Sequence, residues 1–291
     1  MSSTKPTRSQ REEARAIAER LQKEQQAAEA RRQRTILISL LVVGALAIGG
    51  VIWFIFANAG ESSSGTIDVP NLSRADDPFE GIKAPAGVTA DGGIVVGADG
   101  VAGSTDGADA DAVTVKVYSD FLCPFCQMFE QTNGPVLAEL REAGDVVTEY
   151  HLVSILDRAA AGTQYSTRAA AAVALVADQQ PEAFVDFMDA LFVNQPSEGA
   201  SGLTDAAMAE LARQAGVSAD VAAQIEDGSY ARGEDSYVPW VAAVTEQASR
   251  DLPRLATPAV LLNGQDIGQD GLGVDWRVPG ALEAAVEQVR G

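Results

Sequence analysis

Cys123 and Cys126 are the residues of this chain whose type and spacing could do redox chemistry. A Cys-x-x-Cys pair places two sulfurs within disulfide reach across one helical turn. Thiol–disulfide exchange then proceeds by attack of a thiolate on a disulfide sulfur. Free N–H groups at a helix N-terminus favour the thiolate, so Cys123 is predicted to be the nucleophile and Cys126 the more buried resolving cysteine. Pro124 suits the first helical turn, where its missing N–H costs little.

The elements around this pair are predicted from hydrophobic periodicity. Val113–Tyr118 alternates apolar and polar residues and is β-branched, which is typical of a strand. Residues 124–143 have helical periodicity and end at Gly144, and Val146–Ile155 is a second strand. Strand, helix and strand within about 40 residues indicate a βαβ unit and a parallel sheet. A Cys-x-x-Cys pair in that frame indicates a thioredoxin-like redox site.

Two structural explanations of the cysteine pair compete with the redox explanation. A structural zinc site needs four ligands, and the one further Cys or His in the chain is His151. A structural disulfide closing so short a loop would constrain little of the unfolded chain. We therefore predict no metal and no cofactor. His151 is expected to be a packed or edge residue of its strand, with proton transfer near Cys126 as the alternative.

Thr257-Pro258 is a second mark of the same site. Proline directly before a strand is where thioredoxin folds carry a cis peptide bond facing the cysteine pair, although an ordinary trans proline opening a strand is the simpler alternative. A cis bond here would leave neighbouring backbone groups free to pair with an extended substrate. We therefore predict that Thr257 and Pro258 bind substrate.

The rest of the body is predicted to be a helical block followed by a short antiparallel return. Residues 163–250 are helical, with Thr204 and Ser218 as N-caps. Ala259–Leu262 is a strand that turns at Asn263-Gly264, and a terminal helix begins at Pro279. The order βαβ, helices, ββ, α predicts an α/β domain with a helical insertion.

Four segments resemble the DsbA family of thiol–disulfide oxidoreductases: DFLCPFCQMFE, TEYHLVSILD, STRAAAAVALVAD and TPAVLLNG. The likeness is greatest to membrane-anchored actinobacterial and mycobacterial DsbA-like proteins, and it covers residues 112–291. It implies a thioredoxin-like fold with an inserted helical domain, Cys123 and Cys126 as the catalytic pair, and Thr257-Pro258 as the cis-proline pair. It also implies a membrane quinone-linked reoxidant, either DsbB-like or of the vitamin K epoxide reductase type.

The chain departs from the strongly oxidising members of that family at two places. Those members often have His between the cysteines, where this chain has Phe125, whose side chain cannot stabilise a Cys123 thiolate. Pro124 and Phe125 are thus the residues expected to tune the pair, toward a less oxidising potential. Some members also carry a buried Glu–Lys pair, and the matching positions here are Val117 and Glu149, so that pair is predicted to be absent.

The N-terminal part predicts a membrane anchor. Residues 35–57 are 23 uncharged residues, which as a helix would be roughly 35 Å long and could cross a bilayer core of about 30 Å. Residues 1–34 hold nine basic and five acidic residues, so the positive-inside rule places them in the cytoplasm. A signal peptide cleaved near Ala57-Asn58-Ala59 is the alternative, but the apolar run is longer than such peptides need.

Four segments follow from these patterns. Residues 1–34 are a basic, helical cytoplasmic segment and 35–57 a single transmembrane helix. Residues 58–111 are a flexible linker rich in Gly, Ser and Asp, in which Ile94–Val96 could form a small docked strand. Residues 112–291 are the extracytoplasmic DsbA-like domain, with its helical insertion at about 160–250. The formal net charge of −20 excludes a nucleic-acid-binding body.

The leading hypothesis is a membrane-anchored thiol oxidase that introduces disulfides into unfolded secreted proteins with reduced cysteines. The same site could instead serve a thiol reductase or disulfide isomerase, which Phe125 makes credible. A third hypothesis is a non-catalytic adaptor that uses the fold to bind a membrane complex, and it predicts that Cys123 is dispensable.

Overall fold

The computed structural model describes residues 67–268 and 271–290. The predicted cytoplasmic segment, the predicted span 35–57 and the first part of the predicted linker lie outside the described residues. Among the helices of the described ranges, none is both long enough and apolar enough to cross a bilayer.

The centre of the body is the predicted βαβ unit. Strand β2 (Val113–Ser119) continues through a short loop into helix α2 (Pro124–Glu142), and strand β3 (Val146–Leu152) returns parallel to β2. Alternate β2 valines are fully buried, as the alternation in sequence predicts. Helix α2 ends as expected at Gly144, whose φ of +82° is a conformation that glycine adopts without strain.

Shorter strands extend this pair into a five-stranded sheet of order β1-β3-β2-β4-β5. Strand β4 (Ala259–Leu262) runs antiparallel to β2, and β5 (Gln265–Asp266) pairs with β4 after the predicted Asn263-Gly264 turn. Strand β1 (Ile94–Val96) pairs antiparallel with β3 at the other edge. The sheet is therefore mixed, with its one parallel pair at the βαβ unit.

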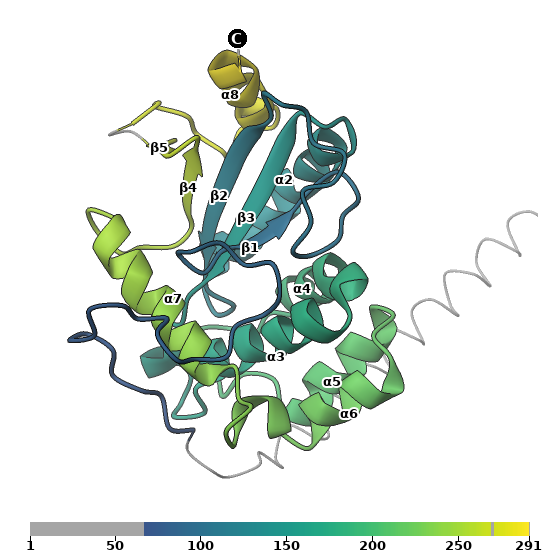
Figure 1. The fold of residues 1–291 in the computed structure, drawn as a ribbon, viewed down its shortest axis with the longest axis vertical. Helices are drawn as coiled ribbons and strands as arrows, with labels where there is room; N and C mark the ends of the chain where they lie inside the picture. The colour runs from purple at the N-terminus through teal and green to yellow at the C-terminus, as the bar shows by residue number, and fades with distance from the viewer. Residues whose placement is uncertain (1–66, 269–270, 291) are drawn as a thin grey trace, which may run out of the picture. The chain divides into compact units, whose positions relative to one another are not determined.

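The predicted helical insertion forms the lower half of the body in Figure 1. Helix α3 is buried from Tyr165 to Ala177, which its Ala-rich sequence allows because small side chains let neighbouring helices approach closely. Thr204 and Ser218 cap their helices as predicted, each accepting a backbone N–H three residues on. The inserted helices are α3 (Tyr165–Gln179), α4 (Phe184–Val193), α5 (Asp205–Gln214), α6 (Ala219–Glu226) and α7 (Val238–Asp251).

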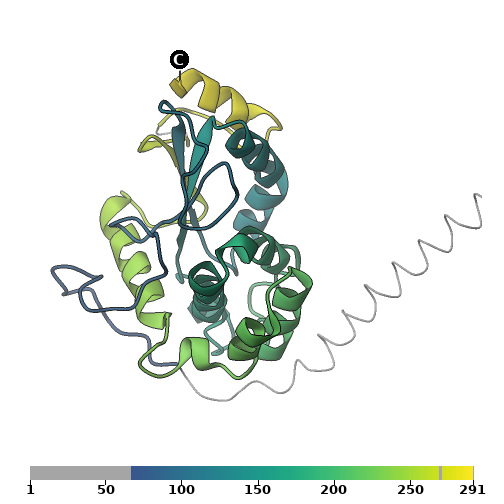
Figure 2. The same ribbon diagram turned by 45° about the vertical axis from the view of Figure 1, so that its right-hand side comes forward.

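Helices cover both faces of the sheet. Figure 2 shows α2 and α7 on opposite sides of it. The terminal helix α8 (Ala281–Arg290) packs against α2 and β2 and is held by Arg290, whose guanidinium pairs with Asp109 at 2.7 Å and Asp111 at 3.2 Å.

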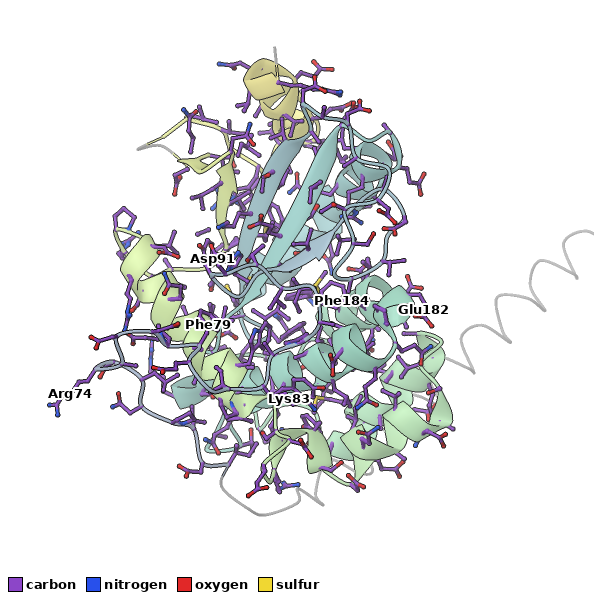
Figure 3. The ribbon with its side chains drawn as sticks, viewed as in Figure 1. Arg74, Phe79, Lys83, Asp91, Glu182 and Phe184 are labelled. Atoms are coloured by element: carbon purple, nitrogen blue, oxygen red, sulfur yellow. The ribbon has the colours of Figure 1, made fainter. Side chains whose placement is uncertain are left out.

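The described part of the predicted flexible linker is folded onto the body. The side-chain amide of Gln164 bonds both backbone groups of Ile67, at 2.8 and 2.9 Å, and Arg250 of α7 donates to the carbonyls of Ala75 and Asp76. Figure 3 labels Phe79, Lys83 and Asp91 along this segment. Residues 67–111 thus contact the body at several points, and several of their glycines have positive φ values typical of turns.

Candidate active site

The two cysteines lie where β2 passes into α2. Cys123 is the N-cap of the helix, with Pro124 as the first helical residue. The backbone N–H groups of Cys126 and Gln127 donate to the Cys123 carbonyl, at 3.0 and 3.2 Å. Cys126 is completely buried, Cys123 is 4% exposed, and both thiols are free. The predicted order, a cysteine at the helix start and a more buried one a turn inside, is confirmed.

The surroundings separate the acidities of the two thiols. A hydrogen bond from Cys126 lowers the pKa of Cys123 to about 6, against burial, which raises it. The side chain of Thr257 and the backbone N–H groups of Cys126 and Phe125 lower it further. Burial, followed by the neighbouring Cys123, raises the pKa of Cys126 well above its usual value. At neutral pH the pair is therefore a Cys123 thiolate beside a Cys126 thiol.

The predicted cis bond faces this pair. The Thr257–Pro258 peptide is cis, and the Cys123 sulfur lies 3.3 Å from the Thr257 carbonyl oxygen, to which it donates when protonated. Strand β4 begins at the next residue, Ala259. The structure thus brings Cys123, Cys126, Thr257 and Pro258 together, although more than 130 residues separate the two motifs.

An apolar surface with one cation borders the site. Phe125 is 50% exposed and Met128, one turn further along α2, is 42% exposed. The guanidinium of Arg277 lies 5.8 Å from the Phe125 ring and 4.8 Å from the ring of Trp276. Met128, Trp276 and Arg277 were not predicted from sequence, since a methionine in a helix and a Trp-Arg pair in a loop carry no motif.

The two apolar residues directly before Cys123 belong to the core. Phe121 and Leu122 are fully buried, and the Phe121 ring stacks on Phe192 of α4 with centroids 4.7 Å apart. Phe125 alone of the three is presented to solvent, because it lies on the outer side of the first turn of α2.

Two side chains hold the loop between β2 and α2. The buried Asp120 carboxyl accepts hydrogen bonds from the N–H groups of Leu122 and Leu156 and from the Ser166 hydroxyl. Its burial raises its pKa to about 6. The Gln195 amide, which follows α4, donates to the carbonyls of Phe121 and Cys123 at 2.9 and 3.0 Å. The inserted helical domain therefore helps to position Cys123.

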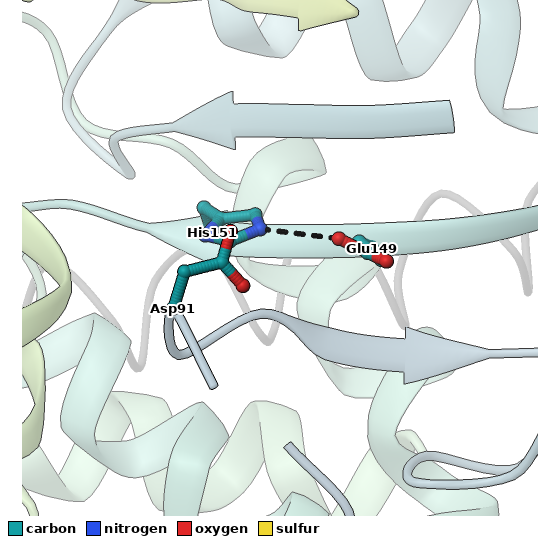
Figure 4. A group of neighbouring side chains, drawn as sticks. All are labelled: Asp91, Glu149 and His151. Atoms are coloured by element: carbon teal, nitrogen blue, oxygen red, sulfur yellow. Dashed lines mark ion pairs between the residues drawn. The ribbon is translucent and has the colours of Figure 1, made fainter. Parts of the chain in front are cut away.

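A charged cluster lies on the sheet at positions where the sequence predicted no ion pair. Lys116 is hydrogen-bonded to Asp91 and lies 3.4 Å from Glu149, and the His151 ring lies 3.6 Å from Glu149 (Figure 4). Val117 is buried, and it is apolar as its sequence position shows. Its neighbour Lys116 supplies the partner of Glu149 instead. His151 is 1% exposed and stacks on Tyr118 at 4.6 Å, which confirms it as a packed residue.

Three residues of this cluster have side chains that could coordinate a metal ion. Asp91, Glu149 and His151 bring one ligand atom each within 4.8 Å of one another. The Lys116 ammonium already supplies positive charge between the two carboxylates, and it helps lower the pKa of Asp91 to about 2 despite burial. The group therefore serves to hold the turn at Asp91 against β3.

The fold and the site define a class: a thioredoxin-fold thiol–disulfide oxidoreductase. A thioredoxin family model matches residues 101–272, more than half of the chain. That match includes the cysteine pair, the cis-proline and the whole helical insertion.

Solved structures narrow the class. The chain is 33% identical to reduced DsbA from Mycobacterium tuberculosis, with a TM-score of 0.52 over 68% of this chain and 92% of that one. It is 34% identical to reduced DsbG, a disulfide bond oxidoreductase from the same organism, with a TM-score of 0.50 over 63% and 86% of the two chains. The chain belongs to the DsbA family of thioredoxin-like thiol–disulfide oxidoreductases.

A curated relative of a different kind shares part of the domain. The serine/threonine-protein kinase PknE of Mycobacterium tuberculosis is 32% identical over 127 residues, which are 42% of this chain and 22% of the kinase. The chain thus spans about a fifth of the length of the curated relatives that it matches.

Proposed function

We propose that this oxidoreductase introduces disulfides into unfolded secreted proteins, using Cys123 as the nucleophile and Cys126 as the resolving cysteine. The observation that carries the direction is the lowered pKa of Cys123, to about 6. Stabilising the thiolate stabilises the reduced pair, and a stabilised reduced form makes the oxidised pair a stronger oxidant.

The proposed reaction begins with the Cys123–Cys126 disulfide. A substrate thiolate attacks the sulfur of Cys123, a mixed disulfide forms, and Cys126 leaves with the electron pair and takes up a proton. A second substrate thiolate then attacks the substrate sulfur and expels Cys123 as its stable thiolate. The substrate has lost two electrons, which the reduced pair holds until a membrane quinone-linked reoxidant, DsbB-like or vitamin K epoxide reductase-like, removes them.

Three groups prepare the site for this sequence. The buried Cys126, with its raised pKa, is protonated once released, which prevents it from competing as a nucleophile. The cis Thr257–Pro258 bond presents backbone next to Cys123 for pairing with an extended substrate chain. Phe125 and Met128 offer apolar contact to the unfolded segments of a substrate.

The proposed setting is the outer side of a cell membrane. Residues 35–57 would be the single span, 1–34 would be cytoplasmic, and 58–66 would tether the extracytoplasmic domain. Support for this rests on the uncharged 23-residue run and the basic segment before it. A fusion of a reporter that is active only outside the cytoplasm, placed after residue 291, should be active, and an inactive fusion would reverse the orientation.

A reductase or isomerase is the second candidate, and Phe125 favours it, because its side chain gives the Cys123 thiolate no donor. The deciding experiment is the redox state in cells, read by acid quench and alkylation with a mass tag. Since the chain has two cysteines, the result is zero or two tags. A mostly oxidised pair that becomes reduced when the reoxidant is blocked supports the oxidase. A pair held reduced in the same compartment rejects it.

A further inference from the structure

A cavity of about 260 Å³ opens between α2 and α4, away from the cysteine loop. Its floor is buried and its mouth is exposed, with Asp189 and Val193 of α4 at the rim. Pockets for drug-sized ligands measure about 300–1,000 Å³, so this cavity suits a smaller molecule or a single side chain. The floor and one wall are formed by Glu130, Gly134, Ala138, Arg141 and Tyr150.

The floor holds a carboxyl group without a partner. Glu130 is 6% exposed, its Oε1 is buried, and neither oxygen makes a hydrogen bond to any of the described residues. Its Oε2 is directed toward Gly134, at 3.8 Å from where a Cβ would lie. The nearby Arg141 donates through Nη1 to the hydroxyls of Thr148 at 3.2 Å and Tyr150 at 3.3 Å, while its buried Nε has no hydrogen-bond partner among the described residues.

Helix α2 carries a glycine and a proline side by side where it lines the cavity. Gly134 has no side chain to fill the space, and Pro135 inside the helix has no N–H. The carbonyl of Gln131, four residues earlier, therefore lacks its α-helical donor. Two adjacent residues thus leave space in the wall, and a lining residue, Gln131, has a carbonyl without its helical donor.

Apart from the Arg141 Nε, the groups without partners and the rim are acceptors or acids, while the other walls are apolar. Val185, Phe192 and Val193 supply apolar contact. A buried acid lacking a partner stays protonated, and burial here raises the pKa of Glu130 to about 8, with Asp189 adding to the shift and Arg141 opposing it. A cation entering the cavity would pair with this acid, and the net charge of −20 favours cations throughout.

We propose that the cavity between α2 and α4 binds a primary ammonium group carried on a short apolar stem. The ammonium would donate to the Glu130 carboxylate and the Gln131 carbonyl, and the stem would lie against Val185 and Phe192. A free alkylamine and the side chain of a lysine share this chemistry. Binding would release the Glu130 proton to solvent, so affinity should rise with pH through the range in which Glu130 titrates.

The test is calorimetric titration of the whole domain with n-butylammonium, Nα-acetyl-lysine methylamide and neutral n-butanol. Glu130→Gln keeps the shape and removes the charge, and Gly134→Leu fills the cavity while keeping the acid. Circular dichroism and the disulfide-exchange assay check that both variants fold. We expect amine binding with proton release, weakened at least about tenfold in each variant. Stronger binding of the lysine derivative identifies a protein side chain as the source of the ammonium group. Stronger binding of butylammonium identifies a free amine. Three results would overturn the proposal. They are the absence of saturable amine binding, butanol binding as tight as amine binding, and an unchanged amine affinity in Glu130→Gln.

Discussion

The first turn of α2 and its middle respond in opposite ways to a negative charge. At the start of the helix the pKa of Cys123 is lowered to about 6, and seven residues on the pKa of Glu130 is raised to about 8. Both groups are buried, so burial alone does not decide. The Cys126 thiol, the Thr257 side chain and backbone N–H groups of the first turn donate to the Cys123 thiolate, whereas no described residue donates a hydrogen bond to Glu130 Oε1. Available donors therefore decide which buried acid ionises.

The largest expected effect is at the donor-rich end. Cys123→Ser should reduce thiol–disulfide exchange to the uncatalysed rate, because a hydroxyl neither forms the disulfide nor leaves as a stable anion. Given a disulfide-bonded model peptide, Cys126→Ser should accumulate a mixed disulfide, because the Cys123 thiolate attacks the peptide disulfide and no Cys126 sulfur remains to release the adduct. Exchange is measured with a reduced model peptide, and the adduct by intact mass. Full cellular function in Cys123→Ser, despite lost exchange, would instead support the adaptor hypothesis.

The next effect is a pH dependence of stability at the middle of the helix. The folded pKa of Glu130, about 8, lies above its ordinary value of 4.5. Folded protein therefore keeps a proton that unfolded protein loses, and the free energy of unfolding should fall as pH rises from about 4.5 to about 8. Urea titrations of the oxidised protein, in which Cys123 does not titrate, should show this fall. Glu130→Gln should make this fall in the free energy of unfolding smaller by up to a few kcal/mol.

In the reduced protein, Cys123 should change the free energy of unfolding with pH in the opposite direction. The folded pKa of Cys123, about 6, lies below its ordinary value of 9.0. Unfolded protein then binds the extra proton, so this group should make stability rise with pH over that interval. An oxidised protein with the same slope as the reduced one would contradict the opposition between the two ends of the helix.

A smaller change should follow from removing one donor to the thiolate. Thr257→Val deletes the hydroxyl and keeps the shape, and it should raise the pKa of Cys123 by about one unit, equivalent to about 1.4 kcal/mol. The ultraviolet absorbance of the thiolate, followed against pH, measures this. Thr257→Ser is the matched control and should titrate like the natural protein, and a pKa unchanged in Thr257→Val would leave Cys126 and the backbone as the effective donors.

The smallest effect concerns the open wall of the cavity. A Cβ at Gly134 would meet Glu130 Oε2 at an ordinary 3.8 Å. Gly134→Ala should therefore stabilise the protein by about 0.5–1 kcal/mol, because glycine costs that much in a helix. Thermal unfolding measures the gain. A destabilised variant would mean that α2 needs its glycine beside Pro135.

The sequence predicted the donor-rich end well and the cavity not at all. Cys123, Pro124 and the strand before them form a local pattern with a known physical meaning, and Thr257-Pro258 adds a mark from the sheet. Glu130 looks like an ordinary polar residue of a helix. It becomes a buried acid only because α4, some 60 residues later, covers it. Gln195 and Arg277 were missed for the same reason, because their partners are distant in sequence.

The docking of residues 67–111 also limits the length of the tether between the proposed transmembrane span and the folded domain. If the proposed span ended at Ala57, the ten peptide links from there to Ile67, which Gln164 fastens to the body, would form the tether. They extend at most about 36 Å, whereas a free chain through residue 111 would reach about five times further. The tether would thus keep Cys123 within a limited distance of the membrane surface. Meeting a membrane reoxidant would become nearly an intramolecular event, while substrates would have to approach the surface as they emerge.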